Sequence, residues 1–187
     1  MKAPSAEFLV IDLPSDHQIE NGLTTEGQLI ATLLHERGLG DATRLEVVAS
    51  KERFKSLAKT HHPDAKIVHI AAHADRDGLG AMGHDLTWDE VAHVLTQIVP
   101  SLEDAQEERV LVLSCCHSRA AYRHLKKLLR MHFTAVYYFS QDIVYFDVAL
   151  MTWSMFYGQK NLRRPTSQIR KPINDFFGAR RLKFRRI

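Results

Sequence analysis

Cysteine is scarce in this sequence: the 187 residues include two, and they are neighbours, Cys115 and Cys116. Adjacent cysteines make a poor structural disulfide, so the composition argues against a small secreted disulfide scaffold and favours a reducing compartment. Long apolar runs are also missing, since no stretch approaches the roughly 18 residues of a membrane span. Residues 1–16 lack the basic start and apolar segment of a secretory signal. We therefore expect a cytoplasmic protein with no membrane span.

No charge of either sign dominates the whole chain. The formal net charge is +3, with 25% charged and 45% apolar residues, which is ordinary for a globular protein. A chain of this length buries a sizeable core without disulfides. We expect one domain, with a core at residues 1–158. Residues 159–187 are expected to form a basic C-terminal helix and tail, packed on that core or extending from it.

The basic residues are concentrated in this last segment. Residues 159–187 hold ten Lys and Arg but one acid, Asp175, so the segment carries +9 and the rest of the chain −6. The final run, Arg180–Ile187, mixes basic and apolar residues. Such a block is typical of a surface that binds nucleic acid, an acidic partner or a membrane, but also of a solvated tail. The sequence leaves these alternatives open.

Apolar runs that predict strands alternate with amphipathic segments that predict helices. Strands are expected at Phe8–Asp12, Leu45–Ala49, Ile67–Ala72, Val110–Ser114 and Thr134–Phe139. Capping pairs, apolar spacing and a glycine stop indicate helices that start at Thr25, Ser50 and Thr87, follow Cys116, span Tyr145–Tyr157, and lie near Ile169–Phe176. This alternation predicts an α/β fold with a mainly parallel sheet and helices on both faces.

Two of the predicted strands end in chemically reactive residues. His73 follows one buried strand and Cys116 follows another. Ligands of such sheets bind at the carboxyl ends of strands, where these two residues are expected to meet. A neighbouring imidazole accepts the thiol proton, and the N-terminus of the following helix favours a thiolate. Backbone N–H groups of Ala74 and Cys116 are candidates to bind an oxyanion.

The residues around this pair resemble a known clan. Cys116-His117-Ser118 resembles the nucleophile turn of metacaspases, and Leu113–Cys116 resembles that of CHAT peptidases, both members of the caspase-like clan. His73 precedes Cys116 by 43 residues, near the roughly 50 typical of caspase-type chains. The resemblance runs from about Phe8 to Tyr157. Its further matches are Asp85–Glu90, Ala135–Phe139 and a helix ending in Phe156-Tyr157.

The resemblance implies a caspase-like cysteine endopeptidase in which Cys116 is the nucleophile and His73 the general base and acid. It also implies a protein substrate. Relatives often act as regulated effectors in bacterial defence or programmed death, so a regulatory partner protein or self-association is expected. The strand after the nucleophile helix ends beside the specificity pocket in this clan, which makes Ser140 and Asp142 candidates to bind substrate. Asp142 is also a candidate to cap the following helix. Asp75 and Asp77, beside the base loop, are weaker candidates to bind substrate.

Ser114 stands where metacaspases have an Asp, two residues before the cysteine, so their specificity pocket does not carry over to this chain. The chain departs from the clan pattern at two further positions. Ala74 replaces the usual Gly after the base histidine, and Arg119 replaces a small or acidic-turn residue three positions after the cysteine. These departures keep a second interpretation open: a catalytically inactive caspase-like scaffold that binds a protein partner or nucleic acid through its basic tail.

The remaining His and Cys residues have simpler interpretations. Cys115 should face the opposite side of its strand from Cys116 and pack in the core. His69 lies inside a strand and is expected to be a hydrogen-bonded structural histidine. Several other histidines could supply zinc ligands, yet no CxxC, HExxH or deaminase signature is present. We expect neither a metal nor a cofactor.

Overall fold

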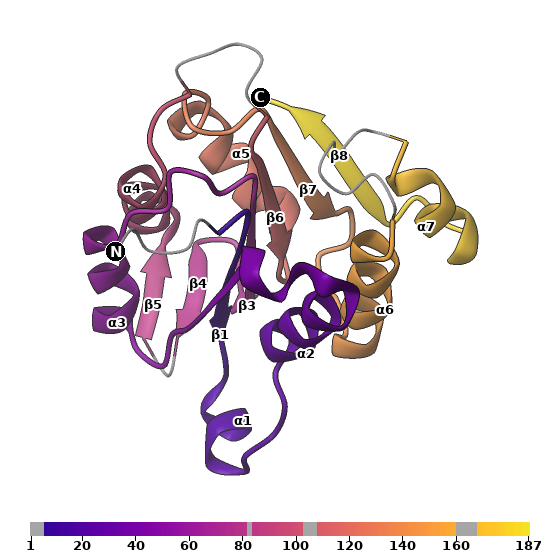
Figure 1. Cartoon of the computed structure of the whole chain (residues 1–187), viewed down its shortest axis with the longest axis horizontal. Helices are drawn as coiled ribbons and strands as arrows, with labels where there is room; N and C mark the ends of the chain where they lie inside the picture. Colours follow the sequence, from indigo (N-terminus) through magenta and orange to yellow (C-terminus); the bar gives the residue numbers. More distant parts are fainter. Residues whose placement is uncertain (1–5, 82–83, 103–107, 160–167) are drawn as a thin grey trace.

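A central β-sheet organises the computed structural model of this chain (Figure 1). The structure describes residues 6–81, 84–102, 108–159 and 168–187. The strands are β1 (Phe8–Leu13), β2 (Thr43–Val47), β3 (Ile67–Ala74), β4 (Gly78–Ala81), β5 (His84–Thr87), β6 (Val110–Ser114), β7 (Ala135–Phe139) and β8 (Leu182–Arg186).

The main path of the sheet has the order β2-β1-β3-β6-β7-β8. Every neighbouring pair on this path is parallel except β7 and β8. Strands β1, β6 and β7 are buried along their whole lengths, as expected for parallel strands covered on both faces. The predicted α/β fold with a mainly parallel sheet is therefore confirmed, and the architecture is consistent with a caspase-like sheet.

Helices cover both faces of this sheet (Figure 1). One core packs α3 (Lys51–Ser56), α4 (Trp88–Ile98) and α5 (Ser118–Leu128) against the sheet. The other core packs α2 (Glu26–Leu34), α6 (Phe146–Tyr157) and α7 (Arg170–Phe176). A short helix, α1 (Asp16–Glu20), lies in the connection between β1 and α2. No helix in the described ranges has both the length and the apolar character needed to cross a bilayer.

Capping residues set the starts of helices α1, α2 and α4. Thr25 caps α2, and the Gln28 side chain returns a hydrogen bond to the Thr25 backbone, which completes a capping box. Thr87 and Glu90 form the same arrangement at α4. Both boxes are confirmed sequence predictions. A third, formed by Ser15 and Gln18 at α1, was not predicted.

Strand β3 extends past the main sheet into a hairpin. His73 and Ala74 pair antiparallel with β4, and β4 pairs antiparallel with β5. Gly78 has to be glycine here, because a Cβ atom at this position would overlap the backbone carbonyl of Leu86. The hairpin was not predicted from sequence, and it fixes the backbone of β3 at the point where His73 emerges.

The C-terminal basic segment contains the helix expected near Ile169–Phe176, which is α7, and its last residues form the edge strand β8 where a tail was expected. Leu182 is buried, and the Phe184 ring lies 4.8 Å from the ring of Tyr137 on β7. These apolar residues alternate with Lys183 and Arg185, which is the period-two pattern of a strand with one buried face. Strand β8 therefore forms because its alternate residues complete the core.

Candidate functional site

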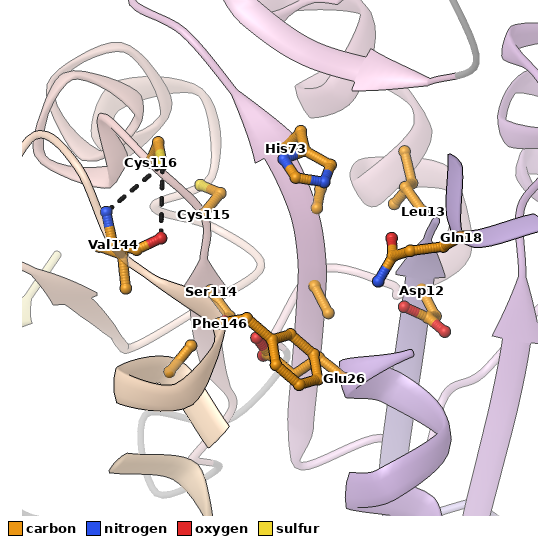
Figure 2. Close-up of a pocket in the computed structure, with 13 residues that line it drawn as sticks. Asp12, Leu13, Gln18, Glu26, His73, Ser114, Cys115, Cys116, Val144 and Phe146 are labelled. Carbon is orange, nitrogen blue, oxygen red and sulfur yellow. Dashed lines mark hydrogen bonds between the residues drawn. The ribbon is translucent and has the colours of Figure 1, made fainter. Parts of the chain in front are cut away.

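A small pocket of about 80 Å³ opens at the carboxyl ends of β1, β3 and β6 (Figure 2). The residues that line it are Asp12, Leu13, Gln18, Glu26, Ala71, Ala72, His73, Ser114, Cys115, Cys116, Val144, Phe146 and Ala149. His73 and Cys116 are both members of this set. The sequence-predicted pair is therefore brought to one pocket, at the edge of the sheet where α/β proteins bind ligands.

Strand register explains why these two residues lie at the same level. The last paired residues of β3 and β6 are Ala71 and Ser114, which are Cα partners in a parallel ladder. His73 and Cys116 each follow two residues later in their own chain segments. Figure 2 shows the His73 ring at the end of β3 and Cys116 on the turn that follows β6. His73 is exposed, whereas Cys116 is half-buried.

The Cys116 thiol is held by the backbone of Val144. Its Sγ atom accepts a hydrogen bond from the Val144 N–H at 3.4 Å and lies 3.7 Å from the Val144 carbonyl, to which it donates. Figure 2 draws both contacts, which lie on the side of Cys116 away from His73. Among the described residues, no hydrogen bond joins Cys116 to His73. Cys116 and His73 share a pocket, but in this conformation the Cys116 thiol donates to the Val144 carbonyl.

The turn after β6 positions Cys116 just before a helix. His117 adopts a left-handed backbone conformation with φ of 51°, the one positive φ among the described non-glycine residues. Its N–H donates to the Asp142 carbonyl at 2.7 Å. Helix α5 begins at the next residue, Ser118, whose buried hydroxyl contacts both backbone groups of Phe139. This N-terminus favours negative charge on a thiol two residues upstream.

Cys115 and His69 have the structural roles predicted from the sequence. Cys115 is 3% exposed and packs in the core beside α5, where burial raises the pKa of its thiol well above the usual range. His69 is fully buried, with Nδ1 2.9 Å from the Tyr157 hydroxyl and Nε2 3.2 Å from a Glu26 carboxylate oxygen. Both ring nitrogens are thereby satisfied, and Glu26 is fixed at the pocket wall.

Two carboxylates that the sequence analysis did not single out also line the pocket. Asp12 is 2% exposed, and burial raises its pKa despite hydrogen bonds from the Thr25 hydroxyl and the Gly27 N–H. Glu26 is the first residue of α2, and its side chain is 12% exposed. A signal was available for Asp12, because an acid at the end of an apolar strand follows the same design as His73 and Cys116.

The predicted substrate-binding residues lie outside this pocket. The Asp142 side chain is 63% exposed, and its nearest carboxylate oxygen is 3.9 Å from His117 Nδ1. Ser140 donates from its hydroxyl to the Arg180 carbonyl and from its N–H to the Arg181 carbonyl, both at 2.7 Å. Asp75 accepts hydrogen bonds from the next turn of the β3–β4 hairpin. Each of the three stabilises a connection around the pocket.

The two predicted oxyanion donors differ in their surroundings. In the hairpin, the Asp75 N–H donates to the Gly78 carbonyl, so residues 73 and 75 direct their hydrogen bonds toward β4. The backbone groups of Ala74 point the other way, and the pairing with β4 leaves its N–H unused. No acceptor for the Cys116 N–H is found in the described part of the chain. Cys116 lines the pocket, so its amide is available to an anion there, whereas Ala74 is not among the lining residues.

Metal-binding groups do not gather in the same way. Within the ranges that the structure describes, no three His, Cys, Asp or Glu side chains are arranged to hold a metal ion. The ionisable groups that line the pocket are the thiols of Cys115 and Cys116, the His73 imidazole and the carboxylates of Asp12 and Glu26. Comparison with protein-family models and with curated proteins finds no match to this chain.

Proposed function

We propose that this chain is a caspase-like cysteine endopeptidase of the CHAT or metacaspase type, with Cys116 as nucleophile and His73 as general base and acid. One observation carries the proposal: the two residues stand at equal offsets beyond a paired position of adjacent parallel strands and line one pocket. A cysteine with no histidine at the matching end of the adjacent strand would not have this arrangement.

The proposed reaction needs a short sequence of proton and acyl transfers. The Cys116 thiol leaves Val144, and its proton passes to the His73 imidazole. The thiolate attacks the carbonyl carbon of a peptide bond, and the resulting oxyanion is stabilised by the N–H groups of Ala74 and Cys116. His73 returns the proton to the leaving amine, the peptide C–N bond breaks, and water hydrolyses the acyl-enzyme with His73 again as base.

The pocket supports a preference for a basic substrate residue. The Glu26 carboxylate lines the same pocket as Cys116 and His73, and charge-assisted hydrogen bonds from Arg or Lys to such a group are stronger than neutral ones. We assign this role to Glu26 in place of Asp142, because the Asp142 side chain is 63% exposed and outside the pocket. Phe146, which is 46% exposed, supplies an apolar rim.

The contact between Cys116 and Val144 supports regulation of the activity. The thiol has to leave the Val144 carbonyl before its proton can pass to His73, so the proposed reaction requires a change in the loop that carries Val144. We propose a cytoplasmic effector, such as those of bacterial defence, that a partner protein or self-association releases from this contact.

The test measures cleavage of a peptide library with basic, acidic and neutral residues at the cleaved position. Cys116→Ala should reduce cleavage to background and His73→Ala should reduce it by about 100- to 10,000-fold. Both should keep the melting temperature within a few degrees. His124→Ala, an exposed histidine on α5, is the matched control and should cleave like the wild type. Retained cleavage in either site variant rejects the assignment.

The inactive scaffold remains the second candidate, because the Cys116 thiol contacts Val144 and not His73. Thiol labelling at neutral pH tests the free chain, in which transient opening of the loop that carries Val144 exposes a reactive thiol only if His73 acts on it. In a peptidase, iodoacetamide should alkylate Cys116 much faster than the buried Cys115, and His73→Ala should slow that reaction. Two slow cysteines, both insensitive to His73→Ala, would favour the scaffold.

A further inference from the structure

An open groove of about 550 Å³ lies between α7 and the edge strand β8, away from the pocket of Cys116. Figure 1 shows these two elements side by side at the far edge of the sheet. The groove is lined by Gln168, Arg170, Lys171, Asn174, Asp175, Arg180, Leu182, Lys183 and Arg185. Five of these nine residues are Arg or Lys. Asp175, the one acid among the described lining residues, lies 3.9 Å from Lys171 and is 66% exposed.

The cations of the groove act on one another. Burial lowers the pKa of Lys183, and the neighbouring charges of Arg180, Arg170, Arg185 and Arg119 lower it further. Arg119 comes from α5, so the positive field extends from α7 across β8 to the start of the nucleophile helix. Like charges gathered at this density repel one another in the free protein. A polyanion relieves that repulsion when it binds, which makes the groove a strong candidate to attract one.

The two elements that carry these cations, β8 and α7, are both held in place by the rest of the fold. Strand β8 pairs with β7 along its whole length. On the other edge, the Asn174 side chain pairs with both backbone groups of Leu182, accepting from its N–H at 2.8 Å and donating to its carbonyl at 3.0 Å. Ile173 anchors α7 in the core. A charged surface fixed in this way loses little conformational entropy on binding, unlike a flexible tail.

An exposed aromatic residue stands at the end of the same helix. Phe176 is 58% exposed and packs edge-on against Phe177 at 5.1 Å between ring centroids. The Arg181 guanidinium covers Phe177 at 5.0 Å. Phe176 is not one of the residues that line the groove, but it belongs to the same helix as Arg170 and Lys171. A basic groove together with an exposed aromatic ring is a combination that binds single-stranded nucleic acid, whose phosphates follow the groove while a base stacks on the ring.

We propose that the α7–β8 groove binds single-stranded nucleic acid, with phosphates at Lys183 and Arg185 and a base on Phe176. An acidic peptide fits less well. Extended peptides usually bind an edge strand by adding a further strand to it, and Asn174 already occupies both backbone groups of Leu182. The proposal does not depend on peptidase activity, because none of these residues lines the pocket of Cys116.

The experiment measures fluorescence anisotropy of a labelled 15-nucleotide oligothymidylate titrated with the full chain at several salt concentrations. The wild type should bind, and its affinity should fall steeply with salt. Lys183→Glu/Arg185→Glu should weaken binding more than tenfold and make the logarithmic salt slope shallower by about 1.4, that is about 0.7 for each lost phosphate contact. Phe176→Ala should weaken binding by about 5- to 150-fold, the range expected for one stacked base.

The matched control reverses the same number of charges elsewhere. Lys126→Glu/Lys127→Glu, in the last turn of α5, changes the net charge equally and should leave affinity within about threefold of wild type. If the charge reversal at Lys183 and Arg185 disturbs folding, Lys183→Gln/Arg185→Gln, which removes both charges without reversing them, replaces it in the same titration. The proposal is overturned by no binding at 50 mM salt, by equal losses in the groove and control variants, or by tighter binding of polyglutamate of matched length.

Discussion

Substitution of Gly27 by alanine tests how α2 is held against the pocket. Gly27 is buried in the first turn of α2, and a Cβ atom there would lie 2.5 Å from both Cβ and Cγ of Asp12. Asp12 has little freedom to move, because it is 2% exposed and accepts hydrogen bonds from Thr25 and from the Gly27 N–H. The clash would force α2 away from β1, and Glu26 would move with the helix.

Two opposing effects decide the size of the change. Alanine is the better helix former by about 1 kcal/mol in a helix interior, and by less in a first turn. Overpacking a well-filled site costs about 1–3 kcal/mol. We therefore expect Gly27→Ala to lower the free energy of unfolding by about 1–2 kcal/mol, although propensity alone predicts a gain.

Urea denaturation followed by circular dichroism measures this free energy. Thr32→Ala, at an exposed position of the same helix, is the propensity control and should change stability by less than about 0.5 kcal/mol. In an Asp12→Gly background the two clashing atoms are gone, so Gly27→Ala should cost at least about 1 kcal/mol less than in the wild type. A Gly27→Ala protein as stable as the wild type, or no coupling to Asp12, would refute the reasoning.

Two further predictions concern the stability of the fold, through the ion pair of Glu90 and the buried hydrogen bond of Ser118. The pKa of Glu90 is lowered to about 2, chiefly by its hydrogen bond with Lys55, so the ion pair stabilises the fold fully above about pH 4.5 and is lost as the pH falls toward 2. Glu90→Gln should lower the free energy of unfolding by about 1 kcal/mol at pH 7, a modest value because solvent screens the ion pair, and by less at pH 3. Urea titrations at the two pH values measure this difference, and an equal loss at both would contradict the prediction. Ser118→Ala should lower the free energy of unfolding by about 1–3 kcal/mol, because the buried Phe139 N–H loses its acceptor. A melting temperature that stays within 1–2 °C of the wild type would contradict this.

The central strands were predictable because each is a continuous apolar run. The strand expected at Val110–Ser114 has those bounds in the structure, whereas the strand expected at Leu45–Ala49 is found two residues earlier, as β2 (Thr43–Val47). Burial on both faces leaves a strong signal at β6, while β2 is partly exposed and carries a weaker one. The shared position of His73 and Cys116 followed from the same reasoning about strand ends.

Short elements and side-chain partners were harder to foresee. Strands β4 and β5 have four residues each, too few to show a period, and β4 contains two glycines. The contact of Cys116 with Val144 joins residues 28 positions apart and depends on how one loop folds back. Glu26 reached the pocket through packing of α2 on β1, which no local pattern encodes.

The loop from Ser140 to Val144 connects Cys116 to the residues just before strand β8. Ser140 is bonded to the carbonyls of Arg180 and Arg181, and Val144 is bonded to the Cys116 thiol. Four residue steps span at most about 14 Å of extended chain. Because this segment is so short, a displacement of Arg180 that leaves these hydrogen bonds intact also displaces Val144, and with it the backbone groups that hold the Cys116 sulfur.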